Sequence, residues 1–121
     1  MKFLWETRKI FSDNTINISC TAVRVPTLRS HCCSISIETE NVIDADDVRE
    51  LLKKSKGVDV VDCIEKNEYP MPINSSNRYN VQVGRIRQSL VFREYGIDLF
   101  VASDQLLKGA ALNAVQIAEL L

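Results

Sequence analysis

The spacing of apolar residues changes along the first third of the chain and predicts three elements there. Residues 1–11 contain no helix breaker and place Leu4 and Phe11 on one helical stripe, which predicts a helix. From residue 16 the pattern switches to strict alternation, so residues 16–22 and 31–38 are each predicted to form a strand with one buried face.

The remaining two thirds of the chain continue with shorter elements. Asp44 can cap a helix that Gly57 is placed to end. Strands are predicted over residues 58–61, 81–87 and 97–103, an exposed loop over 68–80, and a closing helix over 106–121. Because two-residue alternation dominates, this order predicts an α+β fold with a mixed, largely antiparallel sheet and helices packed on one face.

Composition narrows the class of protein further. The length of 121 residues suits one domain. The chain has 15 Lys and Arg and 16 Asp and Glu, which give a net charge of -1. This balance excludes a basic surface for nucleic acid and a polybasic membrane patch. The 4 cysteines have no CxxC spacing and 1 histidine cannot complete a zinc site, so we expect reduced thiols, no metal and a cytoplasmic location.

Arg24 and His31 are the first candidates for chemistry, because each shares the parity of its predicted strand's apolar face near the connection between the strands. If the two strands are neighbours, both side chains emerge at one rim. A guanidinium there can grip a carboxylate, and an imidazole can shuttle a proton. The alternative is a histidine in a structural hydrogen bond and an arginine reaching to water, and spacing alone favours it.

Two further groups carry weaker signals. Glu6 and Lys9 share one helical face and can bind an amino group and a phosphate, although the spacing alone clearly favours a surface ion pair. Asp104 is a good N-cap for the last helix, and Gln105 beside it can hydrogen-bond an amide-bearing ligand. A helix packed on a core is the simpler interpretation of that segment.

Four motifs, in order, resemble those of aspartate-semialdehyde dehydrogenase and together cover nearly the whole chain. They are Glu-Thr-Arg-Lys-Ile at 6–10, Val-Arg-Val-Pro-Thr-Leu-Arg-Ser-His at 23–31, Val-Gly-Arg-Ile-Arg at 83–87, and Asp-Gln-Leu at 104–106 with Gly-Ala-Ala-Leu-Asn-Ala-Val-Gln at 109–116. The resemblance implies NADPH-dependent reduction of L-aspartyl-4-phosphate to aspartate semialdehyde, a step in lysine, threonine, methionine and diaminopimelate synthesis.

The same resemblance implies a role for each candidate residue. Arg24 binds the substrate α-carboxylate and His31 is the general acid and base. Glu6 contacts the substrate amino group, Lys9 contacts the phosphate, and Gln105 touches the nicotinamide end of NADP. A related reductase of N-acetyl-glutamyl phosphate fits less well, because Glu6 is suited to a free amino group.

The family's nucleophilic cysteine, in an Asn-Cys context, and its nucleotide-binding glycine turn do not occur in this sequence. The resemblance therefore implies the C-terminal part of the enzyme, with a substrate-binding and homodimerising domain over residues 1–103. Residues 104–121 then form a helix that returns to an absent NADP-binding domain, so we expect this helix to be poorly covered. We expect the chain alone to be inactive; the alternative is a non-catalytic dimerisation or binding module.

Overall fold

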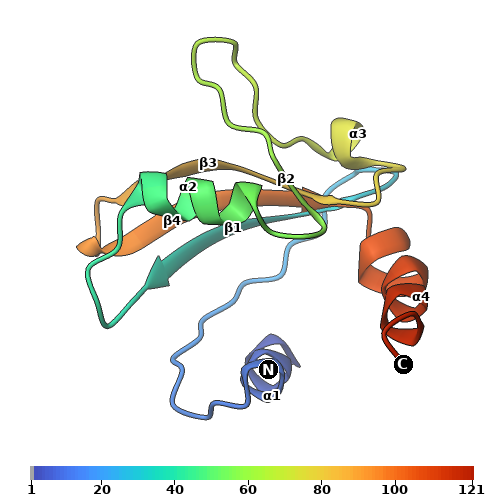
Figure 1. The fold of residues 1–121 in the computed structure, drawn as a ribbon, viewed down its shortest axis with the longest axis horizontal. Helices are drawn as coiled ribbons and strands as arrows, with labels where there is room; N and C mark the ends of the chain where they lie inside the picture. Colours follow the sequence, from blue (N-terminus) through green and yellow to red (C-terminus); the bar gives the residue numbers. More distant parts are fainter. Residues whose placement is uncertain (1) are drawn as a thin grey trace.

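The computed structural model describes residues 2–121, which form a four-stranded sheet with the helix Ala45–Lys53 packed on it and the short helix Pro72–Ser75 beside it. The helices at the two ends of the chain are set apart from the sheet (Figure 1). The elements are α1 (Lys2–Phe11), β1 (His31–Glu38), α2 (Ala45–Lys53), β2 (Val58–Val60), α3 (Pro72–Ser75), β3 (Val81–Ser89), β4 (Arg93–Ser103), the π-helix η1 (Leu107–Ala111) and α4 (Leu112–Ala118).

The sheet has the strand order β1-β4-β3-β2. β4 pairs antiparallel with both β1 and β3, whereas β2 pairs parallel with β3. This confirms the prediction of an α+β fold with a mixed, largely antiparallel sheet. The register sets His31, the first residue of β1, opposite Ser103, the last residue of β4.

The hydrophobic core lies between α2 and one face of the sheet. Val83, Ile86, Ile97 and Leu99 are its buried members, and Leu52 is among the half-buried residues that pack against them. Asp44 caps α2 as predicted, accepting hydrogen bonds from the backbone N–H groups of the first turn. Alternation along β1 and β4 sends every second side chain to this core, which explains why the pattern identified these two strands.

A β-bulge in β3 ties the sheet to α2. Arg85 has a φ of 56°, and its N–H and that of Ile86 donate to the Asp62 carboxylate at 2.8 and 3.2 Å. The Arg49 guanidinium on α2 donates from Nε to the same carboxylate at 3.1 Å. At Gly84, just before the bulge, a Cβ would lie only 2.0 Å from the Val61 carbonyl oxygen, so this crossing requires glycine.

The strand predicted over residues 16–22 is wrong. Within the described chain this segment forms no ladder, and β1 has only β4 as a neighbour. Its one side-chain anchor is the Arg8 Nε, which donates to the Ile16 carbonyl at 3.0 Å. Alternation predicts a strand only where a partner edge is available, and nothing in residues 2–121 offers one here.

Several boundaries also differ from the predictions. α2 ends at Lys53, well before Gly57, whose φ of +78° serves a turn after the helix. β3 and β4 are longer than predicted and meet in a tight turn at residues 90–92. The closing helix begins as a π-turn, in which the Ala111 N–H donates to the Leu106 carbonyl at 3.2 Å, before α4 follows.

Candidate functional site

One end of the sheet gathers two of the predicted site residues. β1 begins at His31 where β4 ends at Ser103, so His31 starts its strand beside the segment that carries Asp104 and Gln105. The His31 side chain is exposed and therefore open to a ligand. The structure thus brings together two candidates that the sequence separates by most of its length.

Arg24 has a different setting from the one expected. It lies on the exposed connection between α1 and β1, not at the end of a strand. We expected Arg24 and His31 to lie at the ends of two neighbouring strands. This expectation is wrong for Arg24, because residues 16–22 form no strand. In the described chain no hydrogen bond joins the two side chains, and a role for Arg24 in substrate binding stays a prediction.

Glu6 and Lys9 lie on α1 and both are exposed. The ion pair formed by Glu6 is with Lys2, at 3.6 Å between Nζ and Oε1, rather than with Lys9. Such an exposed pair contributes about 0.5 kcal/mol or less to helix stability. Both Glu6 and Lys9 therefore remain accessible to a charged ligand.

Asp104 forms the polar centre of this end of the sheet. Its carboxylate is fully buried and forms an ion pair with the Arg29 Nε at 2.7 Å. The same oxygen, Oδ2, accepts a hydrogen bond from the Asn77 N–H at 2.8 Å, and Oδ1 accepts one from the Leu106 N–H at 3.0 Å. Asp104 is not the N-cap as predicted, because Leu106 holds that position in η1 without a side-chain cap hydrogen bond. The Asp104 carboxylate instead closes the turn before the helix and joins two distant segments.

The pKa of Asp104 reflects these contacts. Burial raises the pKa, but the hydrogen bonds from the backbone of Asn77 and Leu106 and the adjacent Arg29 guanidinium outweigh it and hold the pKa below its ordinary value. The carboxylate is consequently ionised at neutral pH and balances the charge of Arg29.

Gln105 uses its side chain within the protein. Its Oε1 accepts a hydrogen bond from the Ser30 N–H at 2.8 Å, and the Ser30 hydroxyl lies 3.0 Å from that of Ser76. Ser30 is buried and has a φ of 77°, a left-handed conformation that a serine adopts only when its surroundings hold it. Because Ser30 immediately precedes His31, these contacts set the start of β1.

Periodicity alone identified neither Ser30 nor Arg29 as part of this cluster. Both belong to the connection before β1, where no apolar pattern distinguishes one polar residue from another. The only available signal was the Arg-Ser-His run at 29–31, and the structure shows what the first two of those residues contact.

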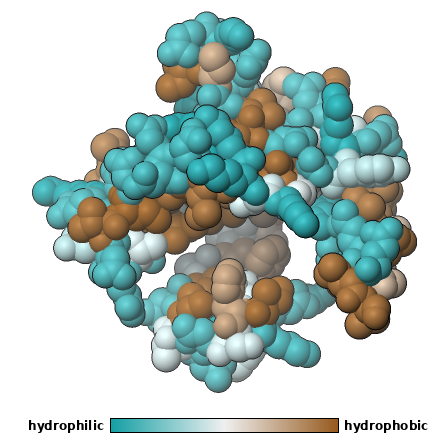
Figure 2. All heavy atoms as spheres, in the orientation of Figure 1, coloured by the Kyte–Doolittle hydropathy of each residue, from teal (hydrophilic) through white to brown (hydrophobic). Residues whose placement is uncertain are grey.

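Apolar side chains are exposed on α1 and around the C-terminal helix, as Figure 2 shows at the bottom of the molecule and at its lower right. Neither α1, η1 nor α4 contains a buried residue. Trp5 is 63% exposed and Ile117 57% exposed. The expected poor covering of residues 106–121 is confirmed, and α1 shares it.

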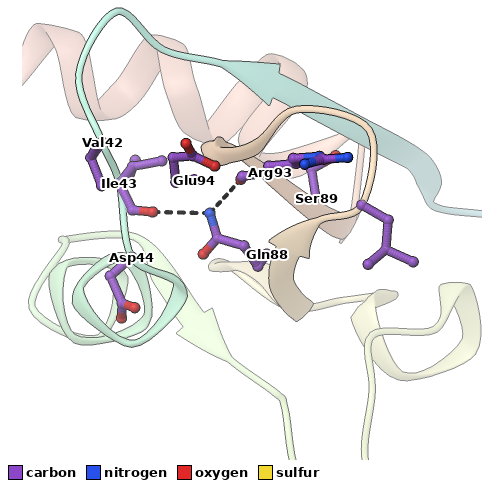
Figure 3. A pocket seen from close by; sticks show the side chains of 8 residues that line it. Val42, Ile43, Asp44, Gln88, Ser89, Arg93 and Glu94 are labelled. Atoms are coloured by element: carbon purple, nitrogen blue, oxygen red, sulfur yellow. Dashed lines mark hydrogen bonds between the residues drawn. The ribbon is translucent and has the colours of Figure 1, made fainter.

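A shallow pocket of about 470 Å³ lies at the opposite end of the sheet (Figure 3). There Gln88 donates from Nε2 to the carbonyl oxygens of Ile43 and Arg93, at 3.0 and 2.7 Å. Arg93 begins β4, whereas His31 stands opposite the last residue of β4, so this pocket is separate from the candidate site. The described residues contain no cluster of three or more metal-binding side chains and no helix of the length and apolarity that a membrane crossing needs.

Comparison with known proteins decides the family. The sequence profile of the semialdehyde dehydrogenase dimerisation domain matches residues 1–108. The chain belongs to the aspartate-semialdehyde dehydrogenase family, of which it is the dimerisation domain. It is 52% identical over 120 residues to the aspartate-semialdehyde dehydrogenase of Aquifex aeolicus and 47% identical over 122 residues to that of Legionella pneumophila.

Solved structures of the family agree with this fold. Aspartate semialdehyde dehydrogenase II from Vibrio cholerae, in a crystal structure complexed with ASA, superposes with a TM-score of 0.93 at 39% identity and covers 99% of this chain. A probable aspartate-semialdehyde dehydrogenase from Pseudomonas aeruginosa gives a TM-score of 0.70 at 28% identity over 78% of the chain. The chain spans 35% of the Aquifex and Legionella relatives and 35% of the Vibrio chain.

Proposed function

We propose that this chain is the substrate-binding and dimerising part of an NADPH-dependent aspartate-semialdehyde dehydrogenase, which reduces L-aspartyl-4-phosphate to L-aspartate 4-semialdehyde and phosphate. The observation that carries the proposal is the meeting of His31 with the Asp104–Gln105 segment at one end of the sheet. We also propose a cytoplasmic location, with which the four free cysteines are compatible.

The charges of the substrate match the charged candidates. Aspartyl phosphate carries an α-carboxylate, an ammonium group and a phosphate, which require a cation, an anion and a second cation. Arg24 would bind the carboxylate through its planar fork of donors. Glu6 would bind the ammonium group, and Lys9 the phosphate. All three side chains are exposed, which keeps them available for these contacts.

His31 would move the proton. The reaction replaces phosphate on the acyl carbon by a thiolate and then delivers a hydride, and each step develops charge on an oxygen. An imidazole at the first residue of β1 can donate a proton to that oxygen and take it back. No Asn-Cys pair occurs in the 121 residues, so the thiolate must come from elsewhere in the complete enzyme.

NADPH would supply the hydride, and Gln105 is the residue of this chain that we expect to reach it. Since the Ser30 N–H can only donate, the atom it meets on Gln105 is the carbonyl oxygen, which leaves the amide Nε2 as a donor. A donor suits the carboxamide oxygen of a nicotinamide. Around Gly109 an added Cβ would meet nothing closer than 3.7 Å, so a flat ring can approach there.

The sheet face opposite α2 would form the homodimer contact. On that face β1 presents the exposed residues Cys32, Ser34 and Ser36 beside the partly exposed Phe100 of β4. Asp98 Oδ1 and Gln82 Oε1, also on this face, are buried without a hydrogen-bond partner in the described chain. A second copy of the chain can cover the exposed residues of this face.

A chimeric enzyme tests the proposed activity. The 121 residues would replace the 52% identical segment of the Aquifex aeolicus enzyme, and NADPH production from aspartate semialdehyde, phosphate and NADP would be measured. We expect turnover in the chimera and its loss by about 100-fold or more in His31→Ala, because general acid–base catalysis contributes about that factor.

As a control, an alanine substitution outside the site, Asn41→Ala, should leave the turnover rate of the chimera unchanged. A chimera that folds and dimerises but has no turnover would contradict the catalytic proposal and favour a non-catalytic dimerisation module. The 121-residue chain alone should be inactive, since it contains neither an Asn-Cys nucleophile nor a glycine-rich nucleotide turn.

A further inference from the structure

The buried Asp104 carboxylate is part of a closed ring of contacts. Asp104 accepts from the Asn77 N–H at 2.8 Å, and the neighbouring Ser76 hydroxyl lies 3.0 Å from the Ser30 hydroxyl. Ser30 donates its N–H to Gln105 at 2.8 Å, and Gln105 is the residue next to Asp104. Three segments far apart in the sequence are thus fixed to one another by contacts that pass through Asp104 and its neighbour.

The ring contains two residues with left-handed backbone conformations, of which the one at Ser30 is uncommon for its residue type. Ser30 has a φ of 77° and Asn77 a φ of 62°, and both are members of the ring. The Arg29 Nε crosses the ring to Asp104 at 2.7 Å, so the residues on both sides of the Ser30 amide are anchored. The next residue along the chain is His31. The ring therefore fixes the backbone position from which the His31 side chain extends.

We propose that Asp104 is a positioning residue for the candidate site: through Arg29, Asn77 and Gln105 it fixes Ser30 and so sets where the His31 imidazole meets the substrate. Asp104 is buried and touches no substrate itself. The inference rests on the proposed function in giving His31 the proton transfer. A catalytic group displaced by about 1 Å can lose about 100-fold in rate.

The chain provides a matched control in Asp62. That carboxylate is also nearly buried, with 6% of its side chain exposed, and it binds the same kinds of donors, one arginine Nε and two backbone N–H groups. It follows β2 and binds the N–H groups of the β3 bulge, not those of the His31 end of the sheet. A purely structural role for Asp104 predicts the same consequences for Asp104→Asn and Asp62→Asn.

Two measurements test the proposal. In the chimeric enzyme we expect both substitutions to lower the thermal midpoint, but only Asp104→Asn to lower kcat, by about 10- to 100-fold, with a smaller change in KM. In the 121-residue chain, His31 is the only histidine, so its ring signals in an NMR spectrum report its surroundings directly. We expect Asp104→Asn to shift them and to speed hydrogen exchange at the Ser30 amide, and Asp62→Asn to leave both unchanged.

Equal kcat values and equal His31 signals in the two variants would overturn the proposal, and so would a shifted His31 signal with an unchanged kcat. If Asp104→Asn does not fold, Arg29→Gln tested against Arg49→Gln decides, because each removes the guanidinium and keeps the buried carboxylate in place. A chimera without any activity would contradict the proposed function, whereas the NMR comparison would still support or overturn the positioning role of Asp104.

Discussion

Asp104 and Asp62 illustrate, at the scale of single residues, how polar groups organise this small domain. Each carboxylate gathers one arginine and two backbone N–H groups from separate segments of the chain. The sequence predicted Asp104 as a helix cap but could not predict its partners. Hydrogen-bond partners depend on which loops meet in space, and composition and periodicity carry no information about that.

The lowered pKa of Asp104 predicts how stability depends on pH. Its pKa in the folded state lies below the ordinary aspartate value of 3.8, so its ionised form stabilises the fold above that pH. This contribution is lost as pH falls through the lower, folded-state pKa. We therefore expect Asp104→Asn to be less stable than the natural chain at pH 7, with the difference shrinking below pH 3.8.

Urea unfolding of both proteins at a series of pH values would measure this difference. Glu50 offers a control, since its pKa is also lowered, chiefly by a hydrogen bond from Lys53, but it is exposed. Glu50→Gln should change stability far less. A gap between Asp104→Asn and the natural chain that is the same at all pH values would contradict the prediction.

At the scale of elements, the predictions succeeded where both partners of an element lie within the chain. The strands His31–Glu38 and Val81–Ser89 find β4 between them, and α2 finds the face that they form. Residues 16–22 carry the same alternation but have no partner edge in the described chain, and there the prediction failed. Alternation at residues 16–22 therefore indicated a preference for strand structure, but these residues do not form a strand in this chain.

The unequal covering of the elements predicts unequal local stability. α1 and α4 contain no buried residue, whereas β3 and β4 contain most of the buried core. In hydrogen-exchange measurements on the 121-residue chain, we expect the amides of β3 and β4 to exchange slowest and those of α1 and α4 to exchange many times faster. Equal protection of α4 and β4 would show that the chain covers α4 by itself or through a second copy.

At the scale of the whole molecule, the open sheet face predicts assembly. We expect the chain, with a mass of 13.7 kDa, to sediment in analytical ultracentrifugation at twice that mass. Ser34→Arg places a charge at the centre of the proposed contact and should give the monomer mass, because an unpaired buried charge is costly. Asn41→Arg, on the exposed connection before α2, should leave the mass doubled, and a doubled mass for Ser34→Arg would exclude this face as the contact.

The candidate site, like the fold, was predicted from the sequence only in part. The sequence suggested a charged group for each part of an acidic amino-acid substrate, and these roles stay predictions. The structure places His31 directly after Ser30, whose N–H donates to Gln105. Arg24 sits on a connection whose expected strand is absent, so its position relative to His31 had no basis in periodicity. The substrate-binding role of Arg24 depends on the chemistry of the motif more than on any geometry inside this chain.

The kinetics of Arg24→Ala in the chimeric enzyme test the central claim most directly. We predict a rise in KM for aspartate semialdehyde and a fall in kcat/KM of about 10- to 100-fold, since a charge-assisted pair with the α-carboxylate contributes about 1.5–3 kcal/mol. Lys66→Ala, which removes an exposed cation from a distant loop, should leave both constants unchanged. If kcat and KM of Arg24→Ala equal those of the parent chimera, this chain does not bind the substrate through Arg24.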